Sequence, residues 1–375
     1  MNQSHERKGV VMIINKKIVA NMEVPRLQQL TINCLIHLFK GEEKFTDEKA
    51  QSFVDLLQNL KHYSISLGLS DRVDLQEILF NRCTQAQFEA IVGEDLYVLG
   101  AIDQLVIEKL GWGVALYCLD KGLIGYIDLS YVDLTGLEEL IDWDRLDLSS
   151  VMKLDLEDAK HVPMGLIAKA LEAGVKEINL SELDLTGLEK SIDWGRLDLS
   201  GVEKLDLWVA THVPMPLIAK ALNARVKTII LWNVDLTGLE ALIDWDRLDL
   251  SDFERLGLFG AIDLPIRLIV KALKAGVKTI DLSYVDLTGL EESIDLDRLD
   301  LTGVETLELE FASDVPMGLI AKVLEAGVKE INLTGVDLTG LEASIDWDRL
   351  DLSDVKNLAL FDCKNIPPQL SALWS

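Results

Sequence analysis

Cysteine is scarce in this chain, and the arrangement of the few cysteines argues against two kinds of site. The four residues, Cys34, Cys83, Cys118 and Cys363, are scattered over 375 positions and show no spacing typical of a metal site. They also do not form the dense pattern of a disulfide-stabilised secreted domain. We therefore predict reduced thiols, with no metal and no other cofactor.

Long apolar runs are missing as well. The run at residues 10–14 is interrupted by Asn15, Lys16 and Lys17, so it is too short for the core of a secretory signal peptide. No run approaches the roughly 20 residues that span a bilayer. The sequence thus predicts a soluble protein of a reducing compartment. We therefore expect a cytoplasmic location.

Positive charge is in short supply, above all in the second part of the chain. The formal net charge is −27. Residues 1–123 hold 13 Lys and Arg against 16 Asp and Glu, whereas the remaining residues hold 23 against 47, a net charge of −24. Such a negative potential disfavours nucleic acid and anionic membranes as partners, and it favours a protein partner with a basic or mixed surface.

What the second part does contain is a repeat. The hexapeptide Asp-Leu-Thr-Gly-Leu-Glu recurs every 51 residues, beginning at Asp133, Asp184, Asp235, Asp286 and Asp337. A fixed period of this size is the signature of a solenoid or a similar array, in which each unit buries its apolar side chains against its neighbours.

Each period contains two similar halves, of 27 and 24 residues, and each half carries the pattern of one strand. The first type reads Val175-x-x-Ile178-x-Leu180, and the second reads Val202-x-x-Leu205-x-Leu207. In such a strand the leucines point to one side and the residues between them to the other. Strands are expected to begin at Ile124, Val151, Val175, Val202, Val226, Phe253, Val277, Val304, Val328 and Val355.

These halves resemble the leucine-rich-repeat family, and their alternation resembles its ribonuclease-inhibitor branch. The resemblance implies an α/β fold: a right-handed horseshoe of ten parallel strands, with helices on the convex side and an open concave face. One feature departs from the family, because Val, Leu or Ala stands where an Asn or Cys usually follows the strand (Leu183 and Ala210, for example). The partners of the turn backbone groups are therefore left open.

We predict two domains, a mainly helical N-terminal domain at residues 1–111 and the solenoid with its caps at residues 112–375. Apolar residues at helical spacing between Leu27 and Leu38, and a possible Thr84–Gln87 capping box, indicate the helices of the first domain. Two further helical pieces, at 101–110 and 114–121, are expected to lead into the first strand. In the repeats, Thr186 and Glu189 also fit a capping box.

Several residue types that carry chemistry in other proteins are better explained here as structural. Cys34 and His37 lack a third orienting group, so we predict no enzyme activity. His161 and His212 precede Val-Pro in equivalent turns, where a solvated role is expected. Trp143, Trp194, Trp245 and Trp347 recur with the framework, which indicates a packing ladder on the convex side.

The concave positions, in contrast, vary from copy to copy, as a binding site would. The middle strands place aromatic and aliphatic residues there, with acidic residues on both sides, which is the anatomy of a protein-binding hot spot. The alternative is that a terminal segment folds back over this patch. The predicted partner-binding residues are Trp208, Val209, Ile230, Trp232 and Phe259, flanked by Asp155, Glu157, Asp206, Asp281, Glu308 and Glu310.

Two functions follow as hypotheses. The first is a protein–protein interaction module that binds a partner on the concave face. Near-identical repeats, a small helical head and the lack of a signal peptide make it similar to repeat effectors of intracellular bacteria. That resemblance implies a location in the bacterial cytoplasm, or in the host cytosol if the protein is a secreted effector. The second is a ubiquitin-ligase substrate receptor, because Leu30, Cys34 and Leu38 loosely resemble the box that docks onto elongin-type adaptors. In that case the N-terminal domain would recruit the ligase.

Overall fold

The computed structural model describes residues 124–143, 145–224 and 226–373, together with separate positions between 46 and 122. The chain divides into two compact units, residues 1–127 and 128–375. The apolar stripe at residues 27–38 and the Cys34–His37 pair lie outside the described residues, and the boundary near residue 111 stays a prediction. In the first unit the Thr84–Gln87 capping box is confirmed: each backbone N–H donates to the other residue's side chain, at 3.0 and 3.3 Å.

The described residues contain one sheet of eleven parallel strands, arranged side by side in sequence order. All ten predicted strands are present, and each of the registers from β3 to β11 pairs first residue with first residue. Their bounds are β2 Tyr126–Asp128, β3 Lys153–Asp155, β4 Glu177–Asn179, β5 Lys204–Asp206, β6 Thr228–Ile230, β7 Arg255–Gly257, β8 Thr279–Asp281, β9 Thr306–Glu308, β10 Glu330–Asn332 and β11 Asn357–Ala359.

The start of the segment predicted as helix at 101–110 is instead a strand. Residues Ala101–Ile102 form β1, which pairs in parallel with Tyr126 and Ile127 of β2. A strand at this position gives the backbone of β2 a hydrogen-bonding neighbour, a requirement that the apolar pattern alone did not reveal. Gln104 and Ile107, further along the same segment, are helical as expected.

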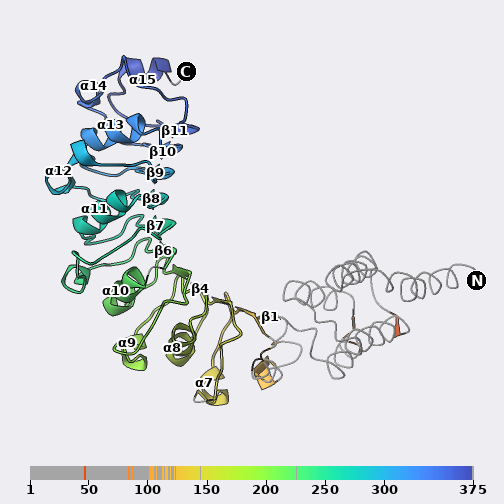
Figure 1. The fold of residues 1–375 in the computed structure, drawn as a ribbon. Helices are drawn as coiled ribbons and strands as arrows, with labels where there is room; N and C mark the ends of the chain where they lie inside the picture. Colours follow the sequence, from red (N-terminus) through yellow and green to blue (C-terminus); the bar gives the residue numbers. More distant parts are fainter. Residues whose placement is uncertain are drawn as a thin grey trace, which may run out of the picture. The chain divides into compact units, whose positions relative to one another are not determined.

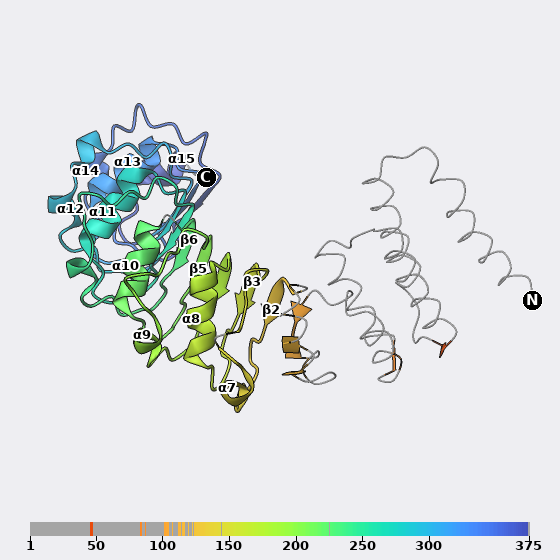
Figure 2. The ribbon, with the colours of Figure 1, turned by 60° about the horizontal axis from the view of Figure 1, so that its bottom comes forward.

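The segments that connect the strands carry the helices. Within residues 128–375 these lie along one side of the stack of strands and leave the other side bare (Figure 1), and they succeed one another in order along that side (Figure 2). Longer helices follow the second-type strands: α8 Met164–Ala173, α10 Met215–Asn223, α11 Ile266–Ala275, α13 Met317–Glu325 and α15 Pro368–Leu373. Short ones follow the first type: α7 Leu137–Leu140, α9 Leu188–Ser191, η2 Leu239–Ala241, α12 Leu290–Ser293 and α14 Leu341–Ser344, with η3 at Leu296–Arg298.

Local sequence explains where the longer helices begin and end. Pro214 is the residue that precedes α10, where its fixed φ and missing N–H cost nothing. Gly174 ends α8 in the left-handed conformation, and its N–H donates back to the last turn. The apolar stripe of each helix faces the inward leucines of the strands, so that Leu207 and Leu217, for example, are fully buried between the two layers.

Backbone hydrogen bonds between successive half-repeats satisfy the turns that lack the usual Asn. The N–H of Glu182 donates to the carbonyl of Trp208 at 2.7 Å, because Glu182 adopts a left-handed conformation that turns its N–H toward the next strand. The N–H of Thr211 then donates to Leu183 at 2.9 Å, and that of Leu185 donates to Thr211 at 3.0 Å. The same pattern recurs along the stack, which replaces the side-chain ladder of the family pattern.

The hexapeptide has a different role from the predicted capping box. The carboxylate of Asp184 accepts both the backbone N–H of Thr186, at 3.0 Å, and its hydroxyl, at 2.7 Å. Helix α9 begins after Gly187, with φ of 96°, and has no side-chain cap. The capping-box prediction for Thr186 and Glu189 is therefore wrong, since the nearer Asp uses the threonine hydroxyl in a local turn.

The repeated tryptophans act as a packing ladder, as predicted. The indole N–H groups of Trp194, Trp245 and Trp347 each donate to the carbonyl five residues earlier, at 3.0–3.1 Å. Trp245 is buried. In the first repeat the ring of Trp143 lies against Gly165 of α8, and in the fourth Leu296 lies against Gly318 in the same way.

Candidate functional site

The bare face of the sheet is a regular grid of side chains. Each strand presents its first and third residues, because its second residue points into the core. The residue two positions after the strand also faces this side. The next residue is left-handed, with φ between 46° and 76° at all ten positions: Tyr131, Asp158, Glu182, Val209, Asn233, Gly260, Tyr284, Phe311, Gly335 and Asp362.

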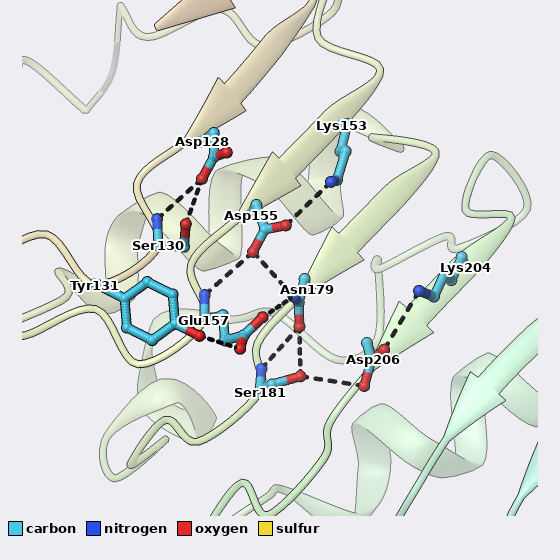
Figure 3. Close-up of polar contacts among 10 residues, drawn as sticks. All are labelled: Asp128, Ser130, Tyr131, Lys153, Asp155, Glu157, Asn179, Ser181, Lys204 and Asp206. Atoms are coloured by element: carbon cyan, nitrogen blue, oxygen red, sulfur yellow. Dashed lines mark hydrogen bonds and ion pairs between the residues drawn. The ribbon is translucent and has the colours of Figure 1, made fainter. Parts of the chain in front are cut away.

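Polar side chains occupy the grid over strands β2–β5, hereafter the polar half (Figure 3). The Tyr131 hydroxyl donates to Glu157 at 2.5 Å, and this bond raises the pKa of Tyr131 to about 12. The Asn179 amide donates to Asp155 at 2.9 Å, and the Ser181 hydroxyl lies 2.5 Å from the Asn179 oxygen. These groups satisfy one another across three strands.

Lysines of the same strands pair with two acids of the polar half. Lys153 lies 3.1 Å from Asp155 within β3, and Lys204 lies 3.3 Å from Asp206 within β5. Each lysine is the first residue of its strand and each aspartate the third, so the two side chains share one face. Glu157 of the same half has no ion pair among the described residues, but it accepts hydrogen bonds from its neighbours.

The aspartates of the third position also have a structural role. Asp206 accepts the backbone N–H of Trp208 at 3.3 Å, and Asp281 accepts that of Ser283 at 3.0 Å. Asp128, Asp155, Asn179 and Asn332 make the same contact two residues ahead. An Asp or Asn at this position thus ends the strand by satisfying a backbone group.

The other end of the grid carries four aromatic rings in contact, hereafter the aromatic ladder: Trp232, Phe259, Tyr284 and Phe311. Successive ring centroids are 5.4, 4.8 and 5.2 Å apart, and the rings are tilted by 37–45°. The ladder crosses strands β6–β9, one ring per strand. Tyr284 and Phe311 remain 50% and 44% exposed.

Glycine makes room for the first ring of the ladder. A Cβ atom at Gly257, the third residue of β7, would lie 2.6 Å from the indole nitrogen of Trp232 and 3.1 Å from the side chain of Ile230. The ring therefore lies over the backbone of β7. Its N–H is buried and finds no hydrogen-bond partner among the described residues, while the Arg255 guanidinium lies 6.0 Å from the ring centroid.

The structure places the predicted residues on the predicted face, although two of them are not accessible there. Trp208 and Val209 are exposed, and Trp232 and Phe259 are half-buried in the ladder. Ile230 is only 7% exposed and Asp281 only 5%. Ile230 lies beneath its larger neighbours, and Asp281 is engaged in the turn of its own strand, so a direct contact of either with a partner is not supported by its position.

A hollow of about 430 Å³ joins the two halves of the grid. Its lining includes Glu157 and Asp206 from the polar half and Trp208, Ile230 and Trp232 from the central strands. Trp208 makes no ring contact with the ladder among the described residues, and its side chain is 36% exposed. The hollow therefore continues the exposed surface from the ladder toward the acidic strands.

The sequence pattern alone missed Tyr284 and Phe311, which supply half of the ladder. Both stand three residues after their strands, in the column of Val209, where the alternation of strand residues no longer indicates which side a residue faces. The signal was present, because the same column holds Gly260, Gly335 and Asn233, residues typical of a left-handed turn. Arg255 and Lys204, the first residues of their strands, were also missed.

Bulky residues in this column are conformationally unfavourable. Val209, Tyr284 and Phe311 have φ of 54°, 58° and 51°, a region that costs a residue with a branched or bulky side chain about 1–2 kcal/mol. Gly or Asn stands at three of the other positions, and Tyr, Asp or Glu stands at the remaining four. The left-handed conformation is therefore a property of the turn in every half-repeat.

Glu308 and Glu310, beside the last ring of the ladder, lack the cations of the polar half. Thr279 and Thr306 stand where Lys153 and Lys204 do, and no ion pair involves either glutamate within the described residues. Burial raises the pKa of Glu308, and the neighbouring charges of Asp281, Glu330 and Glu310 raise it further, against a lowering hydrogen bond from Asn332.

The histidines of the turns are exposed, as predicted, and they also have carboxylate partners. His161 lies 2.9 Å from Asp133, and His212 lies 2.9 Å from Asp184 of the preceding half-repeat. Each histidine is left-handed, with φ of 54° and 52°, and its ring lies beside the Asp-Thr turn of the neighbouring half-repeat. Asp263, Asp314 and Asn365 take the same place in later repeats. The described positions hold no metal-type cluster of three such ligands.

Comparison with known proteins yields no family model, no curated relative and no solved structure that matches the chain. Among the described helices, none has the length and apolar character needed to cross a bilayer. Function therefore has to be inferred from the grid itself.

Proposed function

We propose that the chain is a right-handed leucine-rich-repeat horseshoe that captures a protein partner on the bare face of its sheet, without catalysis. The observation that carries this proposal is the aromatic ladder. It exposes aromatic surface in the middle of a face that no described element covers, although aromatic rings gain most when they are removed from water.

Two further features support binding rather than scaffolding. The framework accepts Ser181 or Thr334 where Trp232 and Phe259 stand, so these rings are not needed for the repeat to form. The net charge of −24 beyond residue 123 makes a partner with a basic or mixed surface the best match, and it disfavours nucleic acid and membranes.

Location in a reducing cytoplasm, and a role as a secreted bacterial effector, are part of the same proposal and rest on the sequence alone. The ubiquitin-ligase alternative depends on Leu30, Cys34 and Leu38, which lie outside the described residues. Recovery of ligase subunits with the full chain would favour it.

The test is quantitative affinity purification with the full chain and two matched variants. Phe311→Ser removes a ring of the ladder. Phe361→Ser removes a ring that follows β11 on the same face, is 72% exposed and contacts no other ring in the described part of the chain. We expect Phe311→Ser to lose a partner that Phe361→Ser retains, by about thirtyfold or more in affinity. Equal recovery with both variants would contradict the proposed site.

A further inference from the structure

The spacing of the aromatic ladder carries information about the partner's shape. Four rings follow one another at 5.4, 4.8 and 5.2 Å, one per strand, in a line that crosses the strands. A segment that lies along this line can place one side chain against each ring only if its own side chains repeat at a similar distance.

Among the regular backbones, one has this repeat. An α-helix advances about 5.4 Å per turn, so it presents one side chain of a given stripe about every 5.4 Å. An extended strand repeats one face about every 6.6 Å, and a polyproline helix repeats about every 9 Å. Over three intervals an extended segment would drift from the rings by about 4 Å, whereas a helix would stay in register.

The charges beside the ladder specify a second stripe. Glu308 and Glu310 flank Phe311 on β9, and Glu330 is the first residue of β10. No described cation pairs with any of the three, whereas Asp155 and Asp206 of the polar half are paired within their own strands. These three carboxylates thus form a group of negative charge without a described cation at the last ring of the ladder.

Together these features lead us to propose that the occupant of the ladder is an amphipathic α-helix of the partner. It lies across strands β6–β9 with an apolar stripe on the rings and a Lys- or Arg-rich stripe over Glu308, Glu310 and Glu330. About three turns, or eleven residues, reach from Trp232 to Phe311. This inference rests on the proposed function and specifies the class of ligand.

The experiment is a selection from three display libraries against the full chain. All have 16-residue members; two have the same composition and the same positive charge. The first places apolar residues at helical spacing with a basic stripe beside them, and the second alternates apolar and basic residues. The third keeps the helical pattern with Glu in place of the basic residues. Because the chain is strongly acidic, only the difference between the two basic libraries reports on shape.

We expect enrichment of the helical basic library alone. The selected peptide should bind Phe311→Ser at least tenfold more weakly than the parent chain. It should bind the double variant Glu308→Gln with Glu310→Gln about threefold to tenfold more weakly. Two control variants should leave the affinity unchanged. The first is Phe361→Ser, and the second is Glu305→Gln, because in the parent chain the Glu305 carboxylate is already paired with Lys329 at 3.0 Å.

Three outcomes overturn the proposal. Enrichment of the alternating library would mean an extended ligand, and if Phe311→Ser abolished its binding the proposed function would still stand. Enrichment of the acidic library would show that the ligand does not carry the proposed Lys- or Arg-rich stripe. Failure of all three libraries would reject a helical ligand, while the affinity purification with Phe311→Ser would continue to decide whether this face binds a partner at all.

Discussion

The polar half and the aromatic ladder occupy the same grid, built by the same repeat, and differ in whether their side chains satisfy one another. In the polar half Asp155 receives both a lysine and an asparagine, so its charge and its lone pairs have partners within the protein. Around the ladder the indole N–H of Trp232 has no described partner, and Glu308 has no described cation. Polar groups that pair with one another within the protein stabilise its fold. Groups that have no partner within the protein can gain free energy by contacting a ligand.

Position in the repeat explains part of this difference. The Asp or Asn at the third strand position closes the strand in six of the ten half-repeats, and Ile230 and Gly257 break that pattern where the ladder begins. Loss of the carboxylate leaves room for the Trp232 ring to lie on the backbone of β7. Asp155, Asp206 and Asp281 are thus first of all structural, and the predicted acids that make no such turn contact are Glu157, Glu308 and Glu310.

The largest expected effect separates two tryptophans. Trp245 is buried and its N–H is bonded to Glu240, so Trp245→Ser should cost about 3–5 kcal/mol of unfolding free energy. Trp232 is half-buried and its N–H is unpaired, so Trp232→Ser should cost only about 1–2 kcal/mol. Chemical denaturation of both variants provides the measurement. Equal losses would place Trp232 in the framework.

A smaller effect is expected from filling the space beneath the ladder. Gly257→Ala puts a methyl group 2.6 Å from the Trp232 indole nitrogen, so the ring must move away from Phe259. We expect a loss of about 1–2 kcal/mol of stability, as for overpacking elsewhere, together with weaker binding. Gly195→Ala, where the nearest side-chain atom is 3.3 Å away in a surface turn, is the control. Unchanged binding by Gly257→Ala would mean that the position of the Trp232 ring does not matter for partner binding.

The pH dependence of stability should reveal the unpaired acid. The folded-state pKa of Glu308 is raised, so ionisation costs more in the folded state, and stability falls as the pH rises through that pKa. Glu308→Gln should therefore raise the melting temperature at pH 7 and leave it unchanged at pH 4, where both folded and unfolded states are largely protonated. A variant that loses stability at pH 7 would show that Glu308 has a favourable partner.

The fold of the repeats could be predicted from the sequence because every repeat contains the same apolar pattern. Leucine alternation predicted all ten strands of the repeat region, and the recurrence of Trp194 and Trp245 correctly assigned those residues to packing. Missed elements lie where local pattern and tertiary pairing diverge. A two-residue strand such as β1 is too short to show a periodicity. Thr186 fits a capping motif, and this fit concealed its hydrogen bond to Asp184.

For the candidate site, alternation identified the face but not which residues are accessible on it. Ile230 and Asp281 point to the correct side and are nonetheless covered, because burial there depends on the neighbours of adjacent strands. Tyr284 and Phe311 lie beyond the strand, where a left-handed residue breaks the period of two. A column read across the repeats, instead of along each strand, would have found them.

The measurement that tests the central claim most directly compares stability and binding in one variant, Phe311→Asn. Asparagine tolerates the left-handed conformation and Asn233 already holds the equivalent place, so the substitution should keep or raise the melting temperature. Val209→Asn, in the equivalent turn after β5, should likewise keep or raise the melting temperature.

For a partner or peptide selected on this face, the account predicts that Phe311→Asn weakens binding by about thirtyfold while the protein becomes no less stable. A variant with a lower melting temperature and the affinity of the parent chain would contradict the account. The aromatic ladder would then be part of the framework and not a binding site.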